Sequence, residues 1–95
     1  MFDARILESG ELLLSGRLDA SQTERAGEVL SKIKTSTTVN FKDLEYISSA
    51  GLGILLMTQQ RLKSSGCALK LTNLNKHIQD IFLYTGFDKI FEIEK

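Results

Sequence analysis

The sequence predicts an α/β domain with a mostly parallel sheet, and three observations support that prediction. Short apolar runs alternate with segments whose apolar residues recur at helical spacing, which is typical of strands followed by helices. Glycine and serine pairs separate these segments, and the chain contains no proline. Ninety-five residues suffice for one hydrophobic core and are too few for two, so we expect residues 1–95 to form a single domain.

The first two elements are predicted to be an antiparallel hairpin. Apolar residues lie at Ile6-Leu7 and at 12–14, on either side of the Ser9-Gly10 turn. A helix should follow between residues 21 and 34, where apolar residues repeat at helical spacing (Ala26, Val29, Leu30 and Ile33). Ser21, with Glu24 three positions later, fits a capping box at the start of this helix.

The rest of the chain predicts alternating strands and helices. Residues 37–41 are rich in β-branched and aromatic side chains, as in a strand, and residues 52–62 carry apolar side chains on one helical face before Gly66. Residues 68–71 alternate like a half-buried strand. Asn75 is a plausible N-cap for a third helix that ends at Gly86, and a last strand lies within 87–94. The order β-β-α-β-α-β-α-β implies parallel strands joined by right-handed crossovers.

Composition and motifs exclude several classes of function. Twelve basic residues balance twelve acidic ones, so the chain lacks the positive charge typical of nucleic-acid binding. The longest apolar stretch, 50–57, is far shorter than the ~20 residues that span a bilayer, and no secretory signal is visible. His77 and Cys67 stand alone, and we interpret them as an ordinary helical residue and a packed thiol. No metal, cofactor or catalytic motif is present, so an enzyme is not expected.

The segment 43–53 is the most informative part of the sequence. It leads from the predicted strand at 39–41 into the predicted helix at 52–62, and Ser48 and Ser49 stand at the expected helix cap. In parallel sheets, functional sites lie at the carboxyl ends of strands, and a helix N-terminus stabilises an anion. One interpretation is structural, with a serine cap and glycines for close packing. The other is that the fold tolerates a phosphate on Ser49.

Asp19 is expected at the same rim of the sheet. It follows the predicted strand at 12–15 within Gly16-Arg17-Leu18-Asp19-Ala20, and it precedes the predicted cap at Ser21. Asp19 is either an ordinary helix-entry residue or a functional carboxylate. Because Ser21 offers an oxygen for capping, we expect the Asp19 carboxylate to be free for another role.

These residues together resemble a STAS domain, and within that superfamily a bacterial anti-sigma factor antagonist. The resemblance covers nearly the whole chain. It rests on Gly16-Arg17-Leu18-Asp19, on Tyr46-Ile47-Ser48-Ser49-Ala50-Gly51-Leu52-Gly53 and on Phe82-Leu83-Tyr84-Thr85-Gly86-Phe87. It implies a STAS-like sheet, mixed and mostly parallel, with an N-terminal antiparallel hairpin and packed helices. The turn around Ser49 combined with the upstream aspartate makes the match specific.

The resemblance also implies a phosphorylation-controlled partner switch. In such families an anti-sigma factor, a serine kinase with a histidine-kinase-like ATPase fold, phosphorylates the serine that is Ser49 here. The unphosphorylated antagonist binds this kinase and frees the sigma factor; phosphorylation abolishes binding, and a PP2C-type phosphatase restores it. The family often has Asp before this serine, whereas this chain has Ser48, which is therefore a competing acceptor.

The likeness also implies where a partner binds. The expected partner-binding surface comprises Asp19, Ala20, Ser48, Ser49, Ala50, Gly51, Leu52 and Gly53. We expect a cytoplasmic bacterial phosphoprotein in transcription regulation, with no cofactor, no nucleic acid and no membrane insertion. Two alternatives are a STAS subunit that docks a membrane-associated ATPase of a lipid or solute transporter, and a scaffold subunit of a stress-sensing assembly.

Overall fold

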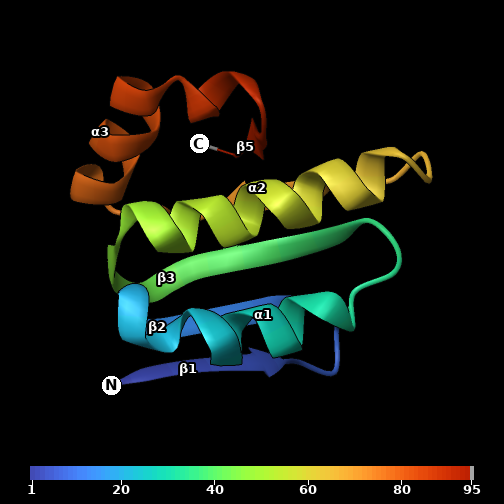
Figure 1. Ribbon diagram of the computed structural model, residues 1–95, viewed down its shortest axis with the longest axis horizontal. Coiled ribbons are helices and arrows are strands. Elements are labelled where there is room, and N and C mark those ends of the chain that lie inside the picture. Colours follow the sequence, from blue (N-terminus) through green and yellow to red (C-terminus); the bar gives the residue numbers. More distant parts are fainter. Residues whose placement is uncertain (95) are drawn as a thin grey trace.

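A computed structural model of the protein describes residues 1–94, which form one five-stranded mixed sheet in the order β1-β2-β3-β4-β5 (Figure 1). The strands are β1 (Phe2–Ile6), β2 (Leu12–Leu18), β3 (Thr37–Ile47), β4 (Leu69–Thr72) and β5 (Glu92–Ile93). β1 and β2 pair antiparallel, and every later pair is parallel. The predicted hairpin, the element order and the mostly parallel sheet are therefore confirmed.

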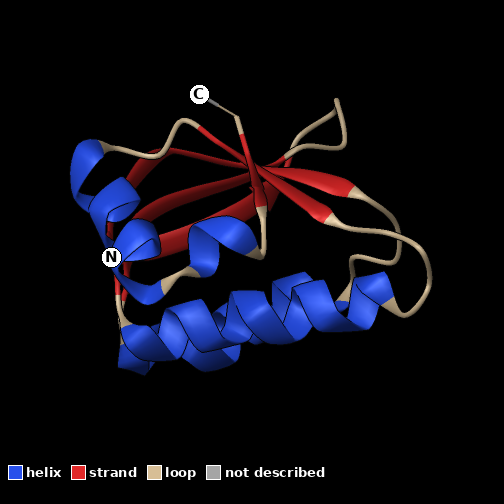
Figure 2. Ribbon diagram, turned by 90° about the horizontal axis from the view of Figure 1, so that it is seen from above, coloured by secondary structure: helices blue, strands red, loops and turns tan. Residues whose placement is uncertain are grey.

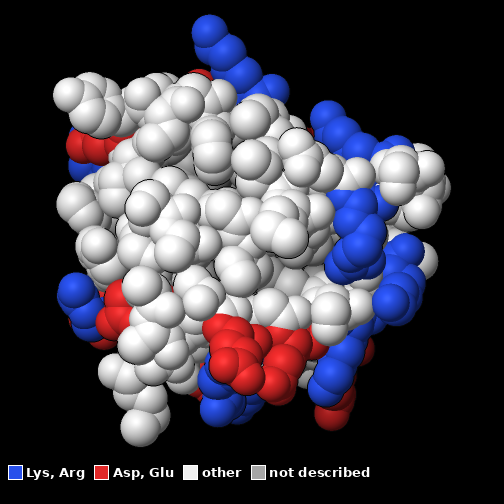
Figure 3. Space-filling model, viewed as in Figure 1, with Lys and Arg blue, Asp and Glu red and all other residues white. Residues whose placement is uncertain are grey.

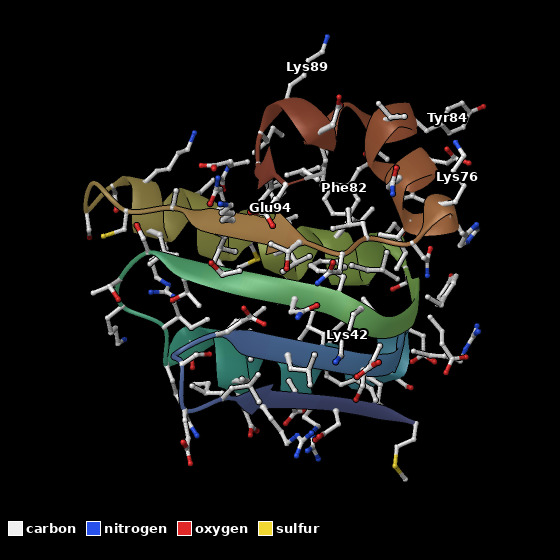
Figure 4. All side chains as sticks on the ribbon, turned by 180° about the vertical axis from the view of Figure 1, so that it is seen from behind. Lys42, Lys76, Phe82, Tyr84, Lys89 and Glu94 are labelled. Carbon is white, nitrogen blue, oxygen red and sulfur yellow. The ribbon has the colours of Figure 1, made fainter. Side chains whose placement is uncertain are left out.

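Two helices cover one face of the sheet, while the third lies toward one of its edges. α1 (Thr23–Ser31) and α2 (Ser49–Lys63) run side by side below the strands in Figure 2. α3 (Lys76–Thr85) lies at the β4 and β5 side of the sheet. Short 3-10 turns, η1 (Ala20–Gln22) and η2 (Phe87–Lys89), precede α1 and β5. In Figure 4, seen from behind, β1, β2 and β3 have no helix in front of them, so their second face is open.

The core lies between the sheet and its helices and extends under α3. Leu12 and Val39 of neighbouring strands are fully buried, as is Leu55 of α2. Phe41 of β3 meets Phe82 of α3 edge to face, with ring centroids 6.2 Å apart. Such ring pairs add stabilisation beyond area burial, and this pair fastens α3 to the central strand.

Two of the predicted helix ends have the expected geometry. Asn75 Oδ1 accepts a hydrogen bond from the Ile78 N–H at 2.8 Å, as an N-cap does. Gly86 ends α3 with φ +80°, a left-handed conformation that favours glycine. The predicted boundaries of this helix are confirmed because both ends carry a residue-specific signal.

Other local predictions are wrong. α1 begins at Thr23 after Gln22, which makes no side-chain cap, so Ser21 and Glu24 do not form a capping box. β3 runs to Ile47, well beyond the predicted strand at 37–41. The last strand does lie within the predicted range 87–94, but it covers only Glu92–Ile93, after η2. A register shift lets β3 continue past charged residues beside β2, which the local apolar pattern does not reveal.

Candidate functional site

The two segments singled out in the sequence meet at one rim of the sheet. Leu18 of β2 and Ile47 of β3 are register partners in the parallel pair. The pairing continues one step further, because the Ser48 N–H donates to the Leu18 carbonyl oxygen at 2.8 Å. Asp19 and Ser48 therefore leave the sheet from adjacent strands, and η1 packs beside the start of α2. This rim is the candidate site.

Gly51 allows α2 to start close to the sheet. A Cβ at this position would lie 2.8 Å from Cγ of Leu18 and 3.0 Å from Cγ1 of Ile47. Both neighbours are buried, so neither has free space to move into. Gly53 differs, because a Cβ there would meet nothing within 4 Å. The close packing of α2 against the sheet therefore requires glycine at Gly51, whereas Gly53 leaves the outer side of the helix without a side chain at that position.

Ser48 and Ser49 have different roles in the turn. Ser48 is the N-cap of α2, half-buried, and its Oγ accepts from the Gly51 N–H at 3.1 Å. Ser49 is the first helical residue and is exposed. Its N–H and that of Ala50 belong to the first turn, where no intrahelical acceptor exists. An anion on the Ser49 side chain would therefore lie beside the positive end of the helix dipole.

Asp19 does not have the free carboxylate expected of it. It is the N-cap residue of η1, and its Oδ1 accepts from both the backbone N–H and the hydroxyl of Ser21. The Ser21 hydroxyl is thus a donor to Asp19 rather than a substitute for it. These hydrogen bonds lower the pKa of Asp19, chiefly that from the Ser21 hydroxyl, and the nearby Arg17 charge acts in the same direction. Asp19 is an ionised, half-buried group at neutral pH.

The predicted partner-binding residues divide into a surface layer and a packing layer. Ala20, Ser49 and Ala50 are exposed, and Asp19, Ser48 and Gly53 are half-buried. Gly51 and Leu52 are buried beneath them, which corrects the expectation that both glycines share one surface. The two glycines differ because the helix turns Gly51 toward Leu18, while Gly53 points outward.

Two residues next to the rim were not singled out as site residues. The Arg17 guanidinium lies 4.5 Å from the ring centroid of Tyr46, a cation–π contact on the open side of the sheet. Gly16, with φ +81°, leaves room for the start of β1, because a Cβ there would lie 1.6 Å from the Met1 carbonyl oxygen. The sequence offers no signal for the Arg17 contact, which depends on the pairing of Arg17 with Tyr46 across a register shift.

The outer face of α2 is free of charge over most of its length. No Asp, Glu, Lys or Arg occurs between Ser49 and Gln60, and Met57 is 68% exposed. Figure 3 shows this uncharged surface across the helix side of the molecule, with basic residues where α2 ends. In the second half of α2, Gln59 is buried, and its side-chain amide donates to the Ile90 carbonyl at 2.9 Å and accepts from the Leu69 N–H at 2.8 Å.

The part of the chain that the structure describes offers little for catalysis. His77 is exposed, and Cys67 is a half-buried free thiol. Within residues 1–94, no group of three or more His, Cys, Asp or Glu is placed to hold a metal ion. None of the helices in this range has the length and apolarity needed to cross a membrane.

Comparisons with known proteins agree on one family. The family model described as "Mlab, STAS domain" matches residues 2–93. BtrV of Bordetella bronchiseptica, which is described as an anti-sigma factor antagonist, is 30% identical over 79 residues. The alignment covers 83% of this chain and 67% of that protein. The anti-sigma-B factor antagonist of Bacillus subtilis is 38% identical over 52 residues, covering 55% of this chain and 48% of that protein.

Solved structures show the same fold. The Bacillus anti-sigma factor antagonist SpoIIAA in its unphosphorylated form aligns with a TM-score of 0.78 at 19% identity, covering 100% of this chain and 89% of that chain. Its phosphorylated form aligns with a TM-score of 0.71, covering 100% of this chain and 92% of that chain. At this identity the likeness establishes the architecture.

Proposed function

The chain belongs to the STAS domain family, and we propose that it is an anti-sigma factor antagonist switched by phosphorylation of Ser49. In this proposal the unphosphorylated protein binds an anti-sigma factor serine kinase, and the phosphorylated protein releases it. The names of BtrV and of the Bacillus subtilis relative support the antagonist class. An antagonist of this kind is a binding module rather than an enzyme.

One observation carries the choice of acceptor. The Ser49 side chain is exposed at the first position of α2, whereas the Ser48 oxygen already accepts from the Gly51 N–H. Phosphorylating Ser48 would replace a cap hydrogen bond and place a bulky dianion at a half-buried position. Phosphorylating Ser49 breaks no hydrogen bond of the turn, so we assign the acceptor to Ser49.

The energetics of the switch follow from the same geometry. A phosphate adds about −1.5 to −2 charges at neutral pH. The free N–H groups at the start of α2 and the helix dipole stabilise that charge in the unbound domain, so the fold should change little. A partner packed over the uncharged face of α2 would instead desolvate the dianion near the ionised Asp19. The cost of that desolvation lowers affinity without a conformational change.

The proposed switch involves two other proteins, a kinase and a phosphatase. The kinase partner has a histidine-kinase-like ATPase fold, and a PP2C-type phosphatase resets the switch. We place the protein in the bacterial cytoplasm, with release of a sigma factor and hence transcription as its output. Asp19, Ala20, Ser48, Ser49, Ala50 and Gly53 supply the contact surface, and Gly51 and Leu52 support it from below.

Intact-mass measurement after incubation with the cognate kinase and ATP tests the assignment. Wild-type protein and Ser48→Ala should each gain one phosphate, and Ser49→Ala should gain none. Phosphate on Ser48 in peptide mapping would move the acceptor by one residue. A protein that binds its partner equally with and without phosphate would instead favour a constitutive docking subunit, as in a transport complex.

A further inference from the structure

Within residues 1–94, β1 is an edge strand whose outward backbone groups have no strand partner. The Leu7 N–H donates to the Glu11 carbonyl at 2.8 Å, and the Met1 carbonyl accepts from the Arg17 N–H at 3.1 Å. Odd-numbered residues of β1 therefore direct their backbone groups toward β2. The N–H and C=O groups of Phe2, Ala4 and Ile6 consequently face away from the sheet, along a free edge.

The side chains of β1 form a pattern that is complementary to itself when reversed. The strand reads Phe2-Asp3-Ala4-Arg5-Ile6, with an acid and a base placed symmetrically about Ala4 and a large apolar residue at each end. Asp3 and Arg5 share the open face of the sheet. Phe2 and Ile6 lie on the helix face, where Phe2 is 3% exposed and Ile6 is 55% exposed.

We propose that a second copy of this chain pairs with β1 in antiparallel fashion about a two-fold axis at Ala4. In this register Ala4 faces its own copy, and each Phe2 faces an Ile6 of the other chain. These are the positions whose N–H and C=O groups point outward, so all of them become hydrogen-bonded pairs. Each Asp3 then lies beside an Arg5 at the closely spaced non-hydrogen-bonded positions, where opposite charges attract. The exposed Ile6 side chain gains an apolar neighbour.

The charges favour this occupant over other strands. Charged side chains on an edge strand commonly prevent pairing with other chains. Here a partner strand must present a base opposite Asp3 and an acid opposite Arg5, and β1 itself does so. The Asp3 carboxylate already has two cationic neighbours in its own chain, Arg25 of α1 at 2.8 Å and Arg5 of the same strand at 3.6 Å, and pairing would add the Arg5 of the other copy as a third. The open faces of the two copies become continuous in one sheet of ten strands, five from each copy.

The resulting dimer leaves the proposed partner surface unobstructed. β1 is one edge of the sheet, and α2 lies over its middle (Figure 1). Each dimer therefore presents two α2 faces and could engage two partner molecules. A pairing of five residues buries less than the ~1,600 Å² of a standard interface, so we expect weak, reversible association seen at high protein concentration.

Sedimentation velocity over a concentration series tests the proposal with charge reversals that are complementary in pairs. Asp3→Arg places two bases on the strand, and Arg5→Asp places two acids, so each variant alone should associate about tenfold or more weakly than wild type. Mixing the two variants places bases opposite acids at every charged position, and heterodimers should form. Circular dichroism melts confirm that each variant is folded, which separates lost pairing from lost structure.

Three outcomes would overturn the proposal. The first is a wild-type protein that stays monomeric at the highest concentration reached. The second is association that persists unchanged in both single reversals, which would locate the interface elsewhere. The third is a mixture of folded variants that associates no better than either variant alone.

Discussion

Substituting alanine at two glycines of α2 should have opposite effects on stability, although the glycines are only two residues apart. At Gly53 the new methyl group meets nothing within 4 Å, so only the helix propensity changes. Replacing glycine by alanine inside a helix stabilises by about 0.5–1 kcal/mol. The Gly53→Ala protein should therefore have a slightly larger free energy of unfolding than wild type.

At Gly51 the same methyl group would lie 2.8 Å from Cγ of Leu18 and 3.0 Å from Cγ1 of Ile47. Leu18 is 0% exposed and Ile47 is 2% exposed, so neither side chain has free space into which to retreat. Overpacking of this kind costs about 1–3 kcal/mol, and the gain in helix propensity offsets part of it. The net expectation for Gly51→Ala is a loss of roughly 0.5–2 kcal/mol in the free energy of unfolding.

Urea and thermal denaturation of both variants beside wild type measure the difference. The two variants should differ by roughly 1–3 kcal/mol, and a shift of 1 kcal/mol moves the melting temperature of a domain this size by about 4–8 °C. A Gly51→Ala protein as stable as Gly53→Ala would refute the close approach of α2 to the sheet. The placement of Ser48 and Ser49 beside Asp19 would then lose its structural basis.

Two further predictions concern the caps at the site, and a third concerns the end of α1. Ser48→Ala should lower the free energy of unfolding by about 0.5–2 kcal/mol in urea denaturation, while Ser49→Ala should leave it nearly unchanged; equal losses would contradict the distinct roles of the serines. Asp19→Asn should weaken kinase binding in titration calorimetry. Its stability deficit should be present at pH 7, begin to shrink below the ordinary pKa of 3.8, and vanish only when the pH falls below the lowered folded-state pKa of Asp19; a deficit that grows in acid would contradict this assignment. Arg61→Ala should cost about 1.5–3 kcal/mol in the same denaturation assay, because its guanidinium donates to the Leu30 and Ile33 carbonyls at the end of α1; a loss within error would show that solvent replaces those bonds.

The sequence predicts the fold well where a local pattern and a residue-specific signal coincide. α3 illustrates this, because its apolar face, the Asn75 cap and the Gly86 terminus are each visible in the sequence and agree. The turn into α2 is similar, since serines and glycines between a strand and an amphipathic segment predict a capped helix. The alternation of strands and helices then fixes the parallel topology through the preferred crossover hand.

The errors arise where the deciding interaction is non-local or where two local signals compete. Ser21 and Glu24 match a capping box, but Asp19 forms the cap of η1 and delays α1 to Thr23. The extension of β3 depends on a register shift beside β2, which no local pattern encodes. Gln59 lies on the predicted apolar face of α2, but its polar side chain gives no sign of how deeply it is buried, because the two backbone groups that satisfy its amide come from distant segments.

The candidate site shows the same division. Asp19 and the serine turn could be assigned to one rim, because both follow parallel strands. The difference between Ser48 and Ser49, and between Gly51 and Gly53, required three-dimensional contacts. The members of each pair look alike in the sequence. Their positions at the start of α2 make Ser48 the cap and leave Ser49 exposed, and they place Gly51 against the sheet and Gly53 toward the surface.

Isothermal titration of the proposed partner, an anti-sigma factor kinase, with Ser49-phosphorylated and unphosphorylated protein tests the central claim most directly. The Ser49→Ala protein serves as a control that stays unphosphorylated under identical conditions. We expect tight binding of the unphosphorylated and Ser49→Ala proteins and at least a hundredfold weaker binding of the phosphorylated form, equivalent to about 2.7 kcal/mol or more. Equal affinities for the phosphorylated and unphosphorylated forms would contradict it.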